Sequence, residues 1–537
     1  MAANDLHLEI LGTSFSITTD EDPAYLEEIL NQYRTAVENT QNIFGMKDPL
    51  KIAVLAGFLL CDEINKIRTQ AGKDREKAEA RRESEDRELE QRTLNLIARL
   101  DRVLEDKVSP LSKLFKLRNQ VKHYEWGSPE WIPRLLGVSN KGGRPWAELW
   151  MGSHPAAPSR LVFGESETGL GELIAGNPAY YLGKRGAEQY GSLPFLFKLL
   201  AADRPLSIQA HPNKAQAREG FEREGRAGLA LDAPDRNYKD PNHKPEIICA
   251  LTPFTGMCGF RPPAEIRRLL GAFLSPAPAS LREGFSPLLA AVNNDEAPSA
   301  LRNFTGALFG LSAAVREELT RFILRQQASG GAEETDAGAA AACGVSAAQR
   351  ELMYRFAELY PGDPALISPL YLNLFSLEPG EAVFLPAGIL HAYIYGFGIE
   401  LMASSDNVLR GGLTPKHVDL PELLKILDFS PFKPEILKPP PENSGGAQNA
   451  PAVCFRYPAP CKEFSLSVMR STGGKTPFCG TGPAICIVTE GELAVGEKGE
   501  IRLKRGESFF IPAGDGDSKP PEFQGNFTLY AASLPAP

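Results

Sequence analysis

Two segments of this chain repeat one pattern: a glycine, five residues, a proline, one residue and a glycine. The first copy covers residues 380–388 (GEAVFLPAG) and the second covers residues 506–514 (GESFFIPAG). In both copies an apolar run lies between glycine and proline, which is typical of a β-strand bounded by turns. We therefore expect two modules of the same β-rich kind in the later part of the chain.

The repeated element resembles the strand-turn-strand signature of cupin barrels, which implies a double cupin (jelly-roll) architecture. The two copies differ in the residues that come after them. His391 lies three residues after Gly388, whereas no histidine occurs beyond residue 417. We expect the second barrel to bind no metal and to have a structural role.

A change of composition near residue 108 separates this β-rich part from the beginning of the chain. Residues 1–108 are rich in charge, whereas the remainder carries nearly all of the 44 prolines and 49 glycines. Such a shift marks a domain boundary, and 537 residues are too many for one hydrophobic core. We predict a multidomain α+β protein. Its parts are 1–108, a barrel from 109–262 with 365–430, a helical insertion at 263–364, and a barrel at 431–537.

The first 108 residues predict a small α/β head followed by a long helix. Alternating apolar residues around Gly12 indicate a hairpin, and helical spacing follows from about Pro23 and again from Ile52. We expect the second helix to continue to about Glu105. Residues near its end predict a short coiled-coil seam, with a solvated single helix as the alternative; they are Leu89, Thr93, Leu96, Leu100 and Val103.

Residues 5–105 resemble the ZapA family of bacterial cell-division proteins. The resemblance rests on GTSFSI at 12–17, DEDPAYL at 20–26 and LKIAVLA at 50–56. It implies an oligomeric, non-enzymatic module that self-associates through its coiled coil and binds the tubulin-like division protein FtsZ.

Charge, hydropathy and cysteine spacing argue against several classes of protein. A net charge of -9 is unlike that of a general nucleic-acid binder, and no apolar run is long enough to span a bilayer. The N-terminus has no signal-peptide pattern. The eight cysteines form no CxxC pair, which favours reduced thiols over a disulfide framework. We therefore expect a cytoplasmic protein.

Gln209 and His211 lie two residues apart in a run flanked by apolar residues. In a strand their side chains share one face, and an amide oxygen beside an imidazole is half of a mixed-ligand metal site. Taken alone, the pair is typical of a surface strand without a ligand. Glu246 and His391 can supply the other half, so these four residues form a candidate zinc set.

The segments around these residues resemble the type I mannose-6-phosphate isomerase family. Matching segments lie in order over residues 115–535 and include LSIQAHPNK (206–214), YKDPNHKPE (238–246) and SDNVLRGGLTPK (405–416). The resemblance implies one zinc ion per chain, with Gln209, His211, Glu246 and His391 as ligands. It makes Arg410 an active-site residue and places in or beside the pocket Lys198, Ser207, His243, Lys244, Tyr393, Glu400, Asp406 and Lys416.

An aldose–ketose isomerisation needs a base near C1 and C2 and a cation for the enediolate oxygen. Zinc can supply the cation as a Lewis acid. For the base we favour Glu400, with Lys244 as the second choice. His243 is a candidate for assisting ring opening.

The phosphate of the substrate requires fixed cations or hydrogen-bond donors. Lys416 and Ser207 suit that role, and Arg410 can hold either the phosphate or the enediolate oxygen. For Asp406 we favour orientation of Arg410 over a direct part in the reaction.

We predict a mannose-6-phosphate isomerase that interconverts mannose 6-phosphate and fructose 6-phosphate, fused to a division-type module. The alternative is a non-catalytic cupin protein that binds a sugar phosphate and is tethered to a cell-division partner. A third interpretation treats the first 108 residues as an error of gene calling. In that case a separate isomerase frame needs a start codon other than Met, such as one at Val108, because the next methionine after Met46 is Met151.

Overall fold

The computed structural model describes residues 4–10, 13–19, 21–44, 48–70, 114–163, 166–293, 296–329, 344–439, 452–480, 482–496, 501–514 and 520–535. They belong to two compact units, Met1–Ser109 and Pro110–Pro537, and each unit is described by itself. No helix within the described ranges is both long enough and apolar enough to cross a membrane.

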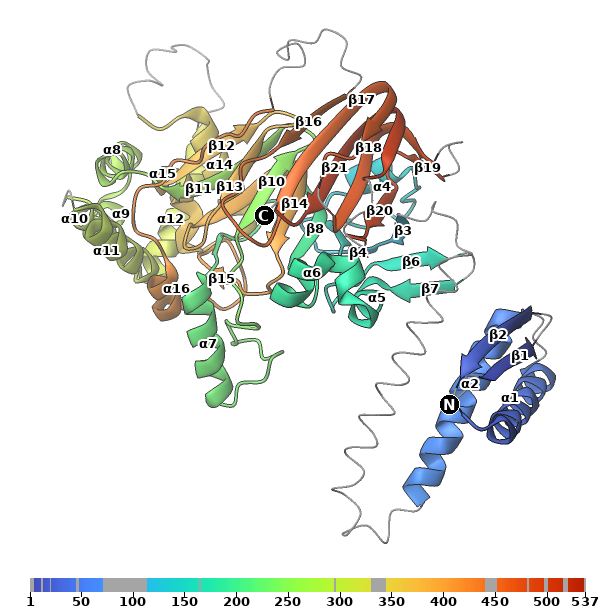
Figure 1. Ribbon diagram of the computed structural model, residues 1–537. Helices are drawn as coiled ribbons and strands as arrows, with labels where there is room; N and C mark the ends of the chain where they lie inside the picture. Colours follow the sequence, from blue (N-terminus) through green and yellow to red (C-terminus); the bar gives the residue numbers. More distant parts are fainter. Residues whose placement is uncertain are drawn as a thin grey trace. The chain divides into compact units, whose positions relative to one another are not determined.

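In its described residues the first unit contains a β-hairpin and two helices (Figure 1). Strands β1 (Asn4–Ile10) and β2 (Thr13–Thr19) pair antiparallel, and helices α1 (Pro23–Phe44) and α2 (Pro49–Gln70) come next in the chain. The expected hairpin and the start of both helices are confirmed. The predicted extension of the second helix to Glu105 and its coiled-coil seam lie outside the described residues.

Both helices of this unit begin in the same way. The carboxylate of Asp22 accepts the backbone N–H of Ala24 at 2.7 Å, and that of Asp48 accepts the N–H of Leu50 at 3.0 Å. In each case a proline occupies the first helical position, where its missing N–H costs nothing. These local signals explain why the sequence alone located the two starts.

The first sheet of the second unit carries the candidate site. Among the described residues it has ten strands, all paired antiparallel, and β14 pairs with β8, β9, β10 and β11. Its strands are β4 (Gln120–Lys122), β5 (Glu148–Met151), β8 (Phe195–Ala202), β9 (Gln209–Ala210), β10 (Glu246–Ala250), β11 (Phe254–Phe260), β12 (Leu372–Leu377), β13 (Ala382–Leu385), β14 (His391–Ala403) and β15 (Leu409–Arg410).

The second sheet has nine strands within the described part of the chain. They are β3 (Phe115–Arg118), β6 (Arg160–Phe163), β7 (Ser166–Gly169), β16 (Ala452–Arg456), β17 (Ser465–Pro477), β18 (Ala484–Val495), β19 (Ile501–Lys504), β20 (Ser508–Ile511) and β21 (Glu522–Ser533). Strand β3 pairs with β20, and β6 and β7 extend the sheet beyond β3. Three strands from the segment that we assigned to the first barrel therefore lie in the C-terminal sheet, an exchange that no local pattern reveals. The closure of the sheets into two cupin barrels stays a prediction.

The two copies of the glycine–proline repeat adopt the same backbone. Gly380 and Gly388 have φ values of 90° and 80°, and Gly506 and Gly514 have values of 88° and 69°. These left-handed conformations favour glycine because it lacks a Cβ atom. A four-residue strand lies between the glycines in each copy, β13 in the first and β20 in the second.

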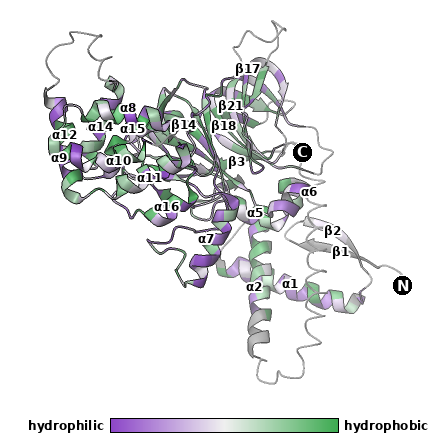
Figure 2. Cartoon of the chain, turned by 90° about the vertical axis from the view of Figure 1, so that its left-hand side faces the viewer, coloured by the Kyte–Doolittle hydropathy of each residue, from purple (hydrophilic) through white to green (hydrophobic). Residues whose placement is uncertain are grey.

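Helices occupy the segment predicted as an insertion. They are α8 (Pro263–Leu274), α9 (Ala279–Gly284), α10 (Ser286–Ala291), α11 (Ala297–Phe309), α12 (Ala313–Ser329) and α14 (Ala347–Leu359). Hydrophilic and apolar residues are interspersed along these helices (Figure 2), as expected of helices that bury one face. Buried residues such as Leu270, Phe304 and Phe356 join them to the first sheet in one hydrophobic core.

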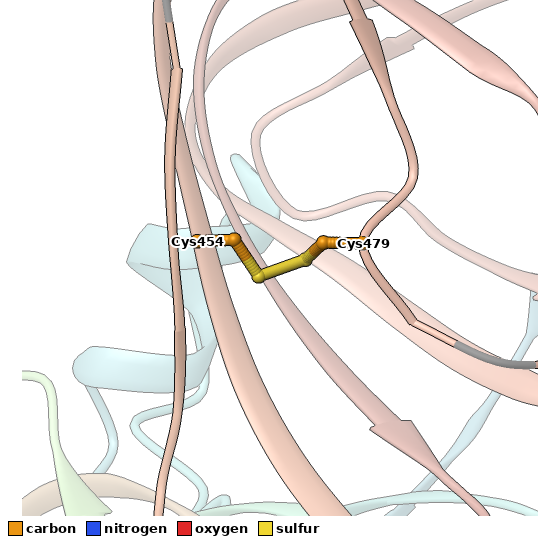
Figure 3. Close-up of a disulfide and its surroundings, with 2 residues drawn as sticks. All are labelled: Cys454 and Cys479. Atoms are coloured by element: carbon orange, nitrogen blue, oxygen red, sulfur yellow. A yellow bond between two sulfur atoms is a disulfide. The ribbon is translucent and has the colours of Figure 1, made fainter. Parts of the chain in front are cut away.

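Cys454 on β16 and Cys479 beyond β17 form a disulfide (Figure 3). The expectation of reduced thiols is therefore wrong for this pair. It failed because the two cysteines are 25 residues apart in sequence and no local pattern indicates that they meet. The other cysteines within the described ranges are free: Cys61, Cys249, Cys258, Cys461 and Cys486.

Candidate metal centre and cavity

Three buried side chains, those of His211, Glu246 and His391, converge in the first sheet. The Nε2 atom of His391 lies 2.8 Å from Oε1 of Glu246, and the Nε2 atom of His211 lies 3.4 Å from Oε2. The donor atoms of the three residues lie within 4.8 Å of one another. Motifs alone grouped these residues from segments far apart in the sequence, and the structure brings them together.

Strand pairing explains this convergence. Glu246, the first residue of β10, lies opposite Leu385, the last residue of β13, and the short connection after β13 leads to His391, the first residue of β14. Gln209, the first residue of β9, lies opposite His391 on one side and opposite Arg410 on the other. Gln209 therefore lies beside the cluster and lines the adjoining cavity.

The hydrogen bonds of the two imidazoles orient their Nε2 atoms toward Glu246. The Nδ1–H group of His211 donates to the carbonyl of Asn407 at 2.8 Å, and that of His391 donates to the carbonyl of Ile389 at 2.9 Å. Backbone partners of this kind fix the tautomer of metal-binding histidines. Nε2 of His391 and Oε2 of Glu246 are buried without a hydrogen bond from any described residue, as is expected of atoms that ligate a metal.

The electrostatics favour the ligand form of these groups. Burial and the nearby Lys244 ammonium lower the pKa of His211 to about 4, so its imidazole is neutral at pH 7. Burial by itself would raise the pKa of Glu246, but Lys244 and the two imidazoles lower it well below its usual value. Two imidazoles and one carboxylate are a donor set that suits zinc.

A second buried cluster surrounds Lys198. Its ammonium lies 2.9 Å from Oε2 of Glu400 and 3.7 Å from Oε1 of Glu148, and all three side chains are less than a tenth exposed. Burial raises the pKa of Glu400, although Lys198 opposes this effect. Burial would also lower the pKa of Lys198, but the two carboxylates outweigh it and raise that pKa. Lys198 is therefore a fixed cation.

The Lys198 cluster lines a cavity of 1220 Å³, and so do Gln209 and Lys244, which lie beside the His–Glu–His cluster. Eight of the residues predicted for the site line it: Lys198, Ser207, Gln209, Lys244, Glu400, Asp406, Arg410 and Lys416. Arg410 and Lys416 have no carboxylate partner among the ion pairs of the described residues. One region of the cavity wall is therefore cationic.

Two residues predicted for the pocket are not among the described residues that line the cavity. Tyr393 is buried behind Glu246, and its hydroxyl donates to Oε1 of Glu246 at 3.2 Å. His243 points to the other sheet, where its Nε2 atom lies 2.9 Å from Oε1 of Glu463. Their predicted place in or beside the pocket stays a prediction. Membership of a motif does not determine toward which side of the backbone a side chain points.

Sequence reasoning missed two partners in the cavity wall. Glu148 accepts the indole N–H of Trp150 at 2.6 Å besides its contact with Lys198. Nε2 of His154 lies 3.2 Å from Oδ2 of Asp406, whereas the predicted contact of Asp406 with Arg410 is not among the ion pairs of the described residues. An acidic residue in an otherwise apolar strand was the available signal for Glu148; the sequence held no signal for the pair of His154 with Asp406.

The fold and the site together define a class: a β-sheet protein with a buried His–Glu–His metal centre beside a partly cationic cavity. Comparison with known proteins identifies the families that the chain matches. A family model described as phosphomannose isomerase type I, catalytic domain, matches residues 114–263, and one described as cell division protein ZapA matches residues 6–101.

Curated relatives and solved structures agree with these matches. Mannose-6-phosphate isomerase of Salmonella typhimurium is 40% identical over 404 residues, which cover 74% of this chain and 94% of that protein. The human protein of the same name is 34% identical over 428 residues, covering 75% and 94%. A zinc-bound structure of mannose 6-phosphate isomerase matches with a TM-score of 0.65 and 36% identity, over 79% of this chain and 100% of that one. The chain belongs to the mannose-6-phosphate isomerase family, with a ZapA-type segment at its N-terminus.

Proposed function

We infer that residues 110–537 catalyse the reversible interconversion of mannose 6-phosphate and fructose 6-phosphate with one bound zinc ion. The observation that carries this proposal is the buried His–Glu–His cluster at the cavity. The chain spans 94% of the Salmonella typhimurium relative, so the resemblance extends over nearly that whole enzyme. Zinc-bound structures of relatives support the choice of metal.

We assign zinc binding to Gln209, His211, Glu246 and His391. The first of these adds an amide oxygen to the two imidazoles and the carboxylate of the cluster. When bound, zinc supplies a Lewis acid for the oxygen that becomes negative in the enediolate. The protein holds these donors on strands β9, β10 and β14 or directly after β9.

For the proton transfer between C1 and C2 we favour Glu400 as the base. Its carboxylate lines the cavity, and burial raises its pKa toward the range in which a general base works. Lys244 is the second candidate, because its ammonium also lines the cavity. That ammonium lies 3.2 Å from Oε2 of Glu246, which favours a role in holding the ligand.

The phosphate group of the substrate fits the cationic wall. Arg410, Lys416 and Ser207 line the same cavity as Gln209 and Lys244, which lie beside the metal cluster. Burial, Arg410 and Lys239 together lower the pKa of Lys416, which indicates a concentration of positive charge. A dianionic phosphate relieves such repulsion, and a guanidinium can bind it through two hydrogen bonds.

A coupled assay with mannose 6-phosphate tests the proposal. Turnover should disappear after chelation and return when zinc is added back. Well-folded, zinc-loaded protein that binds the sugar phosphate without turnover would instead support the alternative, a non-catalytic sugar-phosphate-binding protein.

We further propose that residues 1–108 form a cytoplasmic, self-associating module that binds FtsZ. Besides the match to the ZapA family, α2 exposes Leu50, Val54 and Phe58 at four-residue spacing, a stripe on one helical face. Sedimentation of the full chain should show a dimer or larger species that co-pellets with FtsZ polymers. A monomer that stays in the supernatant would refute this part of the proposal.

A further inference from the structure

His243 and Lys244 are consecutive residues whose side chains reach different parts of the second unit. Lys244 lies at the metal cluster, with its ammonium 3.4 Å from Nε2 of His211. His243 contacts Glu463, which lies in the connection between β16 and β17 of the C-terminal sheet. Pro245 favours an extended backbone at Lys244, and in extended backbone successive side chains point to opposite sides.

The contact between His243 and Glu463 is short and partly shielded from solvent. Nε2 and Oε1 lie 2.9 Å apart, and the two side chains are 25% and 18% exposed. Nε2 makes no hydrogen bond to a described residue, so the contact is an electrostatic one. Shielding makes it stronger than an equivalent contact on the open surface.

Glu463 is held in place by its own surroundings. The backbone N–H of Lys462 donates to Oε2 of Glu463 at 3.1 Å, and the hydroxyl of Tyr190 donates to the carbonyl of Lys462 at 2.8 Å. The next residue, Phe464, is completely buried in the core between the sheets. Glu463 is therefore a fixed point and not a loose surface carboxylate.

The segment on the other side of the contact is held at both ends. The carbonyl of Asn242 accepts the side-chain N–H of Asn407 at 2.8 Å, and the carbonyl of Pro245 accepts the N–H of Ala403 at 3.0 Å. Between these anchors, the His243 side chain is the part of the segment that reaches the C-terminal sheet. Rotation of the backbone at this point would move the ammonium of Lys244 away from Glu246.

We propose that Glu463 is a positioning residue for the isomerase reaction. By holding His243, it fixes the backbone that directs Lys244 into the cavity and against Glu246. The C-terminal sheet thereby contributes to the site in the first sheet, although its own copy of the repeat is not followed by a histidine. The proposal rests on the isomerase function inferred above.

A double-mutant cycle on the zinc-loaded full chain tests the proposal. Glu463→Ala should lower kcat about tenfold, which is the smallest loss usually seen when a group that orients a metal ligand is removed. KM should change less than twofold, and the zinc content should stay at one per chain. Because Glu463 acts through His243, the double variant with His243→Ala should be no slower than His243→Ala alone. Glu492→Ala is the matched control, since Glu492 lies in the same sheet and pairs with Arg502 at the exposed surface.

Three outcomes would overturn the proposal: unchanged kcat in Glu463→Ala, a rise in KM without a fall in kcat, or effects of the two substitutions that multiply. If Glu463→Ala fails to fold, Glu463→Gln keeps the shape of the side chain and is measured in the same cycle, and unchanged kcat there also overturns it. Absence of turnover in the wild-type protein would instead refute the isomerase function, so the two failures are distinguishable.

Discussion

The two copies of the glycine–proline repeat have the same backbone and different chemistry. In both, left-handed glycines enclose a four-residue strand. The first copy leads to His391 in a sheet whose interior also contains the buried charges of Glu246 and Lys198. The second copy lies in a sheet whose described strands bury no charged side chain, and its Ile485, Ile487 and Phe510 are completely buried. The repeat thus specifies a scaffold, and the residues outside it determine whether a metal site is built.

The difference in buried charge between the two sheets also affects the stability of the fold. Buried charges destabilise a fold unless each has a partner, and replacing such pairs by apolar residues is often neutral or stabilising. The charged interior of the first sheet is therefore better explained by function than by stability. The second sheet does not carry the destabilisation that buried charges cause, so it is suited to supporting the first sheet.

The largest effect is expected from removing a metal ligand of the first sheet. His391→Ala deletes one of the two imidazoles that contact Glu246, so zinc binding should be lost. Turnover should fall by more than about 100-fold, which is the largest loss usually seen when a group that only orients a metal ligand is removed. Elemental analysis and the coupled assay measure both quantities. An unchanged zinc content would refute the assignment of His391 as a ligand.

A second substitution contrasts a buried ion pair with an exposed one. Lys198→Met leaves two buried carboxylates without their cation, which should cost about 3–5 kcal/mol in the free energy of unfolding and reduce turnover as well. The matched change Arg502→Met in the second sheet breaks an exposed pair with Glu492 and should cost less than about 1 kcal/mol. Urea denaturation of both variants makes the comparison. Equal losses would mean that the Lys198 cluster is not the special feature that we infer.

A smaller effect on turnover is expected for Tyr393→Phe. The substitution removes the hydroxyl that donates to Glu246, so zinc affinity should fall about 10- to 100-fold, whereas turnover at saturating zinc should change little. Tyr530→Phe is the control, because Tyr530 is a buried tyrosine of the second sheet. Zinc titration of both variants should separate them, and identical affinities would contradict an orienting role for Tyr393.

The smallest effect on turnover is expected for Cys454→Ser. The disulfide with Cys479 closes a loop of 25 residues, so its loss should lower stability by about 3 kcal/mol in the chain-entropy model. Both cysteines lie in the second sheet region, and we expect zinc content and kcat to stay within about twofold of the wild type. Thermal unfolding and the coupled assay report the two effects. A large fall in kcat would show that the second sheet supports the site more tightly than we propose.

Short sequence motifs were enough to predict the residues of the metal cluster. His211, Glu246 and His391 each lie in a recognisable segment, and their convergence depends on strands that begin at or beside those residues. The ion pairs of Glu148 and Glu463 could not be predicted, because they depend on which strands become neighbours. The pairing of β3 with β20 could not be predicted for the same reason.

One zinc site, in the first sheet, is central to the isomerase turnover that we infer. The most direct measurement is a titration of the chelated full-length chain with zinc, in which binding and conversion of mannose 6-phosphate are followed together. We predict that both reach their plateau at one zinc per chain. Turnover without zinc, or turnover that rises only with a second equivalent, would contradict the claim.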